Sequence, residues 1–128
     1  FEIFLKRIER KRNDTLICNA LIDQKVISGI GNYMRADILW LSKISPFRSI
    51  KNLSKNELKK IFDNSIKLAN RSFKIQYSKK ITNKDLIHPS LGFRFFFIYG
   101  KEKDPQGNKV SRKKVGTRTI HYVSKVQK

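Results

Sequence analysis

The sequence predicts an α+β fold, with helices along most of the chain and a β-hairpin at its C-terminal end. Hydrophobic residues in positions 1–73 recur at helical spacing, whereas positions 93–99 form an aromatic run of high β propensity followed by turn residues. A further observation is charge, since 29 Lys and Arg residues against 10 Asp and Glu give a formal net charge of +19. Such a chain attracts polyanions, so nucleic acid is the expected partner.

A first helix is expected at the N-terminus, where Phe1, Phe4, Leu5 and Ile8 fall on one face. Basic residues occupy much of the rest of this segment: Lys6, Arg7, Arg10, Lys11 and Arg12. A charge run of this kind is either a solvated face or a phosphate contact, and the sequence leaves both open. Residues 13–15 then break the pattern and cap a second helix.

Residues 21–40 predict the end of that second helix, a glycine hinge and a third helix. Gly29 and Gly31 offer positions where φ > 0 costs little, and Asn32 is a favoured N-cap for the third helix, which should stop before Pro46. Such a turn presents backbone N–H groups and the positive end of a helix dipole. We expect it to bind an anion, and in so basic a chain a DNA phosphate.

A fourth helix has the clearest local signal. Ser54 and Glu57 form a capping box, and Leu53 and Leu58 are placed for a hydrophobic staple. A core-facing stripe follows at helical spacing: Leu58, Ile61, Phe62, Ser65, Leu68, Ala69 and Phe73. Residues 71–90 turn polar and basic without a sustained period, which predicts a loop.

The C-terminal part predicts a strand over residues 93–99, a turn over 104–108, and strands over 109–115 and 117–123. A hairpin of this size is marginal alone, so its aromatic residues should pack on the helices. Phe93, Phe95, Phe97 and Trp40 could instead stack on bases. We favour the core for them, because clustered aromatic residues in apolar runs more often fill interiors.

Composition excludes several classes of protein. No apolar run approaches the roughly 20 residues of a membrane-spanning helix, and no N-terminal signal pattern is present. A single cysteine argues against a disulfide scaffold. With 128 residues, the chain can hold one domain or two small lobes.

Two motifs, in the same order, resemble the formamidopyrimidine-DNA glycosylase and endonuclease VIII (Fpg/Nei) family. Residues 29–40 read Gly-Ile-Gly-Asn-Tyr-Met-Arg-Ala-Asp-Ile-Leu-Trp, which is more similar to the endonuclease VIII branch than to the Fpg branch. Residues 99–101, 104–108 and 116–127 resemble the family's terminal hairpin. The resemblance implies a helical DNA-binding domain over residues 1–90, with a helix, two-turn, helix motif around 16–42, and a finger over 91–128.

In most of this family the terminal hairpin is a zinc finger with two Cys-x-x-Cys pairs. Here the second pair falls on Val123 and Val126, and the only cysteine is Cys18, so a Cys₄ site cannot form. His88 and His121 could not provide a site by themselves, since lone histidines are far more often packed or solvated than ligands. We therefore expect a zincless finger, with no metal and no cofactor.

The resemblance implies a bifunctional DNA glycosylase/AP lyase of base excision repair, which flips a damaged base, uses an N-terminal proline amine as nucleophile and cleaves by β,δ-elimination. The chain begins at Phe1, and its only methionine is Met34, so we expect a C-terminal fragment that is nearly inactive alone. We expect it to act inside the cell as a monomer on duplex DNA with damaged bases or abasic sites, with no membrane partner. The alternative is a stand-alone nucleic-acid-binding module without activity.

The family resemblance points to two residues as the main candidates for the DNA-binding site. Asn32 matches an asparagine that contacts a phosphate of the damaged strand, although N-capping alone would explain its type. Arg118 matches the arginine at the hairpin tip, which grips phosphates beside the lesion and donates a proton in δ-elimination; the family usually has Gly-Arg where this chain has Gly-Thr-Arg. A weaker set of DNA-binding candidates completes the site: Gly31, Lys25, Arg35, Tyr99 and Lys101.

Overall fold

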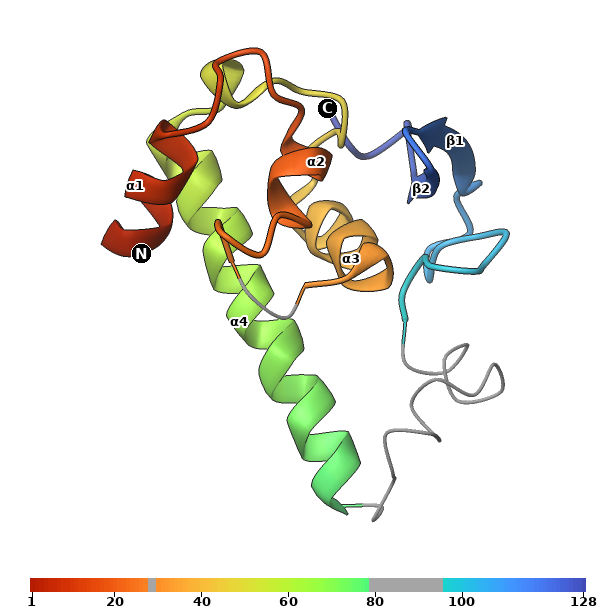
Figure 1. Ribbon diagram of the computed structural model, residues 1–128. Coiled ribbons are helices and arrows are strands. Elements are labelled where there is room, and N and C mark those ends of the chain that lie inside the picture. Colours follow the sequence, from red (N-terminus) through yellow and green to blue (C-terminus); the bar gives the residue numbers. More distant parts are fainter. Residues whose placement is uncertain (28–29, 79–95) are drawn as a thin grey trace.

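The computed structural model describes residues 1–27, 30–78 and 96–128, and within them helices precede a two-stranded hairpin. The elements are α1 (Glu2–Glu9), α2 (Ile17–Leu21), α3 (Asn32–Ser42), the short 3₁₀ helix η1 (Ile50–Asn52), α4 (Lys55–Ser78), β1 (Ser111–Val115) and β2 (Arg118–Tyr122). Figure 1 shows α3 between the long helix α4 and the hairpin, and α3 packs against α2, α4 and β2. The expected order of helices first and hairpin last is confirmed.

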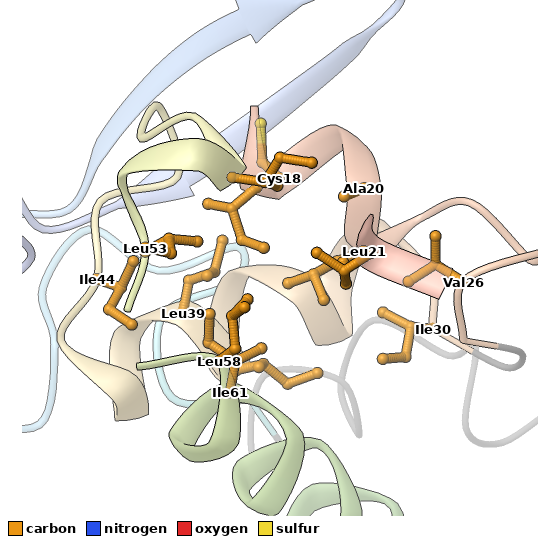
Figure 2. Packing of buried hydrophobic residues seen from close by; sticks show 14 of the residues in the cluster. Cys18, Ala20, Leu21, Val26, Ile30, Leu39, Ile44, Leu53, Leu58 and Ile61 are labelled. Atoms are coloured by element: carbon orange, nitrogen blue, oxygen red, sulfur yellow. The ribbon is translucent and has the colours of Figure 1, made fainter. Parts of the chain in front are cut away.

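The main hydrophobic core lies where α2, α3 and α4 meet. Leu21, Leu39 and Ile61 come from these three helices, and none of them retains any exposed surface. Figure 2 shows their side chains directed toward one another, with Ile44 beside them. Ile120 of β2 belongs to the same cluster, so the hairpin shares its core with the helices. Burial of each such side chain contributes about 1.5–3 kcal/mol.

Helix α1 is amphipathic, as its pattern predicts. Phe4 and Ile8 are buried, while Lys6 and Arg7 are exposed. The Phe4 ring lies 5.4 Å from the ring of Phe62 on α4, measured between centroids. The apolar face of α1 therefore covers α4, and its basic face points to solvent.

The capping box at the start of α4 is confirmed. The Ser54 hydroxyl accepts the backbone N–H of Glu57 at 3.1 Å, and the Glu57 carboxylate accepts the backbone N–H of Ser54 at 3.0 Å. Leu53 and Leu58 are both buried in the core beside this cap. Arg48 pairs with the same carboxylate, so the cap is tied to the loop before it.

The rest of α4 differs from the prediction in two places. Ser65 and Leu68 of the expected stripe are buried, but Ala69 is exposed, and the side chain of Phe73 lies outside the described residues. The helix also continues through residues 71–78, where a loop was expected. That segment is polar but contains no glycine or proline, so nothing in it stops a helix. Residues 79–90 of the expected loop lie outside the described residues.

Helix α2 is shorter than expected. It ends at Leu21, and residues 22–27 form turns instead of continuing to the glycines. The Asp23 carboxylate accepts the backbone N–H of Lys25 at 2.8 Å, and the Asp23 carbonyl accepts the N–H of Val26 at 2.9 Å. An aspartate that bonds its own following backbone competes with the helix, which explains the early stop.

The hairpin strands agree with the last two predicted strands to within two residues at each end. Val115 pairs with Arg118, and Gly116 between them has φ 64°, a left-handed conformation that favours glycine. The strand predicted over residues 93–99 is wrong for its described part, because residues 96–99 form bends and a turn. Residues 93–95, which include Phe93 and Phe95, lie outside the described residues.

Asp37 of α3 explains why residues 96–99 do not form the predicted strand. Its carboxylate accepts the backbone N–H groups of Phe97 at 2.8 Å, Ile98 at 2.9 Å and Tyr99 at 3.4 Å. These donors would otherwise pair with a neighbouring strand, so the aromatic run wraps around a side chain instead of joining a sheet.

The two described aromatic candidates for base stacking pack inside the protein. Trp40 stacks on Phe97 with ring centroids 5.2 Å apart, and both lie against the cluster formed by Ala36, Ile98 and Val123. This agrees with the core role favoured from the sequence. In the part of the chain that the structure describes, no helix is both long enough and apolar enough to cross a membrane.

Candidate nucleic-acid interface

Helix α3 begins at the glycine turn, but its cap differs from the expectation. Gly31 is the N-cap, with φ −100° and ψ −177°, and Asn32 is the first helical residue, without a side-chain cap. Gly31 therefore needs no positive φ. A Cβ at this position would lie 3.0 Å from the ring of Tyr33, so a larger residue there would require that ring to shift. Gly29 lies outside the described residues.

The Asn32 side chain reaches across to the hairpin instead of capping its own helix. Its Nδ2 donates to the carbonyl of Thr119 on β2 at 3.0 Å. Its Oδ1 accepts from Nε of Arg35 at 3.0 Å and from Nη2 of Arg35 at 2.6 Å. Asn32 thus joins the start of α3 to the strand that begins at the hairpin tip.

Arg118 is exposed at the first position of β2, directly before Thr119. The hydrogen bond from Asn32 therefore places the hairpin arginine beside the α3 N-terminus. The first turn of a helix carries unpaired N–H groups and roughly half a positive charge. Together with the exposed guanidinium of Arg118, this end of the molecule can bind an anion on its surface.

Arg35 lies behind this surface, not on it. Its side chain has no exposed area, and Nη1 donates to the carbonyl of Cys18 on α2 at 2.8 Å. Burial lowers the pKa of Arg35; Cys18 opposes this shift, and the nearby charge of Arg118 adds a smaller lowering effect. Because residues three apart share a helix face, Arg35 supports Asn32 from within, and its guanidinium offers no surface to a phosphate.

The remaining candidates are placed as follows. Gly31 is partly exposed at the turn, and Lys25 is exposed on the preceding turn. The Tyr99 ring lies 6.2 Å from the Tyr33 ring, so it belongs to the aromatic group beside the α3 N-terminus. Lys101 is half-buried, and its charge acts on the carboxylate of Asp37. The structure thus brings Gly31, Asn32, Arg35 and Arg118 together, with Tyr99 next to them.

Asp37 was not predicted to have a role, although it stands in the Ala-Asp pair of the motif. Burial raises the pKa of this carboxyl, while the N–H groups of Ile98, Phe97 and Tyr99 oppose that rise. By holding these N–H groups, Asp37 fixes the chain that leads from Tyr99 to the hairpin. Its partners are remote in sequence, so no local signal could have revealed it.

Two polar side chains organise the described part of the finger, residues 96–128. Asp104 accepts the N–H groups of Gln106 at 2.9 Å and Asn108 at 2.8 Å. Gln127 accepts the N–H of Val123 at 2.6 Å and donates to the carbonyl of Ile44 at 3.0 Å. The described residues include no group of three or more His, Cys, Asp or Glu side chains that could hold a metal ion.

His121 and the two valines take up apolar positions in the finger. The His121 ring lies 4.8 Å from the Tyr99 ring, and its buried Nδ1 has no hydrogen-bond partner. Val123 is completely buried and Val126 packs against the same cluster. His121 is therefore packed, as expected for a lone histidine, and His88 lies outside the described residues.

Comparison with known proteins identifies the protein family to which the sequence is similar. The sequence model of the "Formamidopyrimidine-DNA glycosylase H2TH domain" family matches residues 1–84. The formamidopyrimidine-DNA glycosylase of Prochlorococcus marinus (strain MIT 9215) is 31% identical over 131 aligned residues, which cover 99% of this chain and 44% of the relative. The human endonuclease 8-like 1 is 44% identical over 52 residues, which cover 41% of this chain and 13% of that protein.

Solved structures match over nearly the whole chain. A complex of Lactococcus lactis Fpg with DNA containing an abasic site superposes with a TM-score of 0.80, at 22% identity, over 99% of this chain and 46% of that chain. The shared fold therefore extends beyond the helical region to the hairpin. The chain spans less than half the length of the first of these relatives and of the matched structure. It belongs to the formamidopyrimidine-DNA glycosylase H2TH domain family.

Proposed function

We propose that this chain is the damaged-DNA-binding C-terminal part of a bifunctional DNA glycosylase/AP lyase of base excision repair. The observation that carries the proposal is the hydrogen bond from Asn32 to Thr119, which sets the α3 N-terminus beside Arg118. A base can be flipped only if the backbone is held on both sides of it. Two adjacent phosphate-binding groups on different elements suit that task, and a relative of the same fold was solved with abasic-site DNA.

The roles within the site follow from exposure. Asn32 and the N–H groups of the α3 turn, including that of Gly31, bind one phosphate, and Arg118 binds a neighbouring phosphate and donates the proton in δ-elimination. Lys25 and Lys101 add general attraction to the backbone, and Tyr99 supports the site through its ring contacts. The partner is duplex DNA with a damaged base or an abasic site.

We further propose that the chain belongs to the Nei-like branch with a zincless finger. The local identity of 44% to endonuclease 8-like 1 over 52 residues supports this branch, against 31% to Fpg over a longer alignment. Val123 and Val126 occupy the positions of the second cysteine pair and pack in an apolar cluster. Asp104 and Gln127 supply the hydrogen bonds that order the loops in place of a metal.

Borohydride trapping on an abasic-site duplex tests the enzymatic part of the proposal. The 128-residue chain is compared with the product of the longest reading frame that contains it. Schiff-base chemistry needs a neutral amine placed at the lesion, which the family takes from an N-terminal proline. We expect efficient trapping only by the longer protein, with weak background from the many lysines of the chain.

In the longer protein, Arg118→Ala should leave trapping detectable and lower the δ-elimination product relative to the β product. Efficient single-site trapping by the 128-residue chain alone would mean that the nucleophile has been misplaced. Equal inactivity of both proteins would favour a nucleic-acid-binding module without catalysis.

A further inference from the structure

Arg35 is a fully buried cation whose side-chain hydrogen bonds, among the described residues, all go to neutral oxygen atoms. Ion pairs among the described residues join other side chains, and Arg35 bonds only the amide of Asn32 and the carbonyl of Cys18. A charge removed from water is costly unless all its donors are well satisfied, so an unpaired buried arginine is weak evidence for a stabilising role. Its position therefore calls for a role in the site.

That role follows from the chemistry of the Asn32 amide. A guanidinium only donates hydrogen bonds, so the atom of Asn32 that faces Arg35 must be the oxygen. With two N–H groups of Arg35 fixed on Oδ1, the Nδ2 group has to point away from the helix interior. Without Arg35, only the Thr119 carbonyl would hold the amide in this orientation, so the amide would be freer to rotate and to present its oxygen to the surface.

Nδ2 carries two hydrogens, and the carbonyl of Thr119 takes one of them. Asn32 is only half-buried, so the second hydrogen is available to a ligand at the surface. A phosphate oxygen can accept a hydrogen bond but cannot donate one. The orientation set by Arg35 is therefore the one that binds phosphate, and the opposite orientation would repel it.

We propose that Arg35 is a positioning residue that locks Asn32 as a hydrogen-bond donor to DNA phosphate and, through Thr119, holds that donor in register with Arg118. The inference rests on the proposed DNA binding. The anchor of Arg35 is the carbonyl of Cys18 on α2, so both helices of the turn contribute to the orientation of one amide.

A double-mutant cycle on the 128-residue chain tests this inference, with binding to a duplex that carries a tetrahydrofuran abasic analogue as the readout. Asn32→Ala should weaken binding about ten-fold, the size expected for one lost hydrogen bond to a charged group. Arg35→Met should weaken binding about as much in the wild-type background, but hardly at all in the Asn32→Ala background, because the amide it orients is then absent.

Two further variants guard against misfolding as an explanation. Arg35→Lys keeps the charge but cannot hold Oδ1 and the Cys18 carbonyl together, so it should bind as weakly as Arg35→Met. Asn32→Asp keeps an oxygen toward Arg35 and should remain folded, yet it should bind more weakly than Asn32→Ala because it presents a carboxylate to the phosphate. Lys51→Gln, which removes one exposed charge from η1, is the matched control.

A spectroscopic readout separates positioning from general structural damage. In the wild type, the side-chain Nδ2 hydrogen bonded to Thr119 should give a shifted and protected NMR signal. In Arg35→Lys this signal should return to the position of a solvated amide, while backbone signals of α4 stay in place.

The outcomes distinguish a failure of the proposed Asn32–DNA contact from a failure of the positioning role of Arg35. If Asn32→Ala binds as tightly as the wild type, the proposed DNA contact fails. If Asn32→Ala binds weakly but Arg35→Met binds like the Lys51→Gln control, or loses as much affinity in the Asn32→Ala background as in the wild type, the positioning role of Arg35 is overturned.

Discussion

The indole Nε1 of Trp40 donates a hydrogen bond to Oδ2 of Asp104 at 3.3 Å, and this contact joins α3 to the loop 104–108 of the finger. The other oxygen of the same carboxylate accepts two backbone N–H groups of that loop, from Gln106 and Asn108. Burial alone would raise the pKa of Asp104, but its donors together outweigh that effect and lower it. One carboxylate thus orders the loop and ties it to a helix.

Asp104→Ala should therefore destabilise the chain by about 1–3 kcal/mol, since the partly buried hydrogen bonds from the N–H groups of the loop and from the Trp40 indole lose their acceptor. Urea denaturation measures this change. Asp14→Ala is the matched control, because Asp14 is exposed and pairs only with the exposed Arg12, so its loss should cost within about 0.5 kcal/mol.

The same arrangement predicts that the finger needs no metal. The purified chain should contain no stoichiometric zinc, and its thermal unfolding should be unchanged by chelators, because a structural zinc site would otherwise contribute directly to folding. Elemental analysis that finds one zinc ion per chain would contradict this prediction.

The capping box gives a local test of stability. Ser54→Ala should cost about 1 kcal/mol, since the N–H of Glu57 loses its acceptor at the start of α4. Ser124→Ala removes an exposed hydroxyl from the finger and should have no measurable effect. Equal stability of the two variants in urea would show that the box contributes nothing.

Titration of Glu57 gives a pH test of the same box. The hydrogen bond from Arg48 and the N–H of Ser54 lower the pKa of Glu57 in the folded state. Glu57 therefore makes its full contribution to the free energy of unfolding above its pKa in the unfolded chain, about 4.3. That contribution is lost as the pH falls through the pKa in the folded state. Glu57→Gln should flatten the acid side of the stability curve, as measured by urea denaturation across that range.

His121 predicts a second pH dependence, near neutral pH. Burial lowers the pKa of its imidazole, and the charge of its cross-strand partner Arg112 lowers it further. The unfolded chain therefore binds a proton at this imidazole more readily than the folded chain. Protonation of His121 leaves the free energy of unfolding unchanged above about pH 6.5 and lowers it as the pH drops below that value. His121→Phe should remove this dependence while keeping an aromatic ring against Tyr99. A slope between pH 7 and pH 5 that is the same in both proteins would refute the assignment to His121.

Features set by neighbouring residues could be predicted from the sequence. The capping box of Ser54 and Glu57 lies within four positions, and the hairpin turn at Gly116 follows from residues beside it. Helix α4 is longer than its polar composition predicts, because residues 71–78 are polar but include no residue that breaks a helix.

Features set by distant contacts could not be predicted. Asn32 meets Thr119 across 87 positions, and Asp37 meets Ile98 across 61. No local pattern indicates that Arg35 is buried, since an arginine in the first turn of a helix is equally suited to solvent. These residues decide the geometry of the site, and only the packing of α2, α3 and β2 reveals it.

The salt dependence of DNA binding tests the central claim, that the α3 N-terminus and the hairpin tip grip phosphates together. Binding of wild type, Asn32→Ala and Arg118→Ala to several duplexes is measured by fluorescence anisotropy over a range of salt concentrations, with Lys51→Gln as the charge-matched control. Both site variants should bind all duplex sequences more weakly, because they lose phosphate contacts and not base contacts. Arg118→Ala should also lower the slope of log K against log salt by about 1, whereas the uncharged Asn32 should leave the slope unchanged. If both variants bind as the wild type does at moderate salt, Asn32 and Arg118 make no phosphate contacts that contribute to binding, and the two side chains serve only the fold.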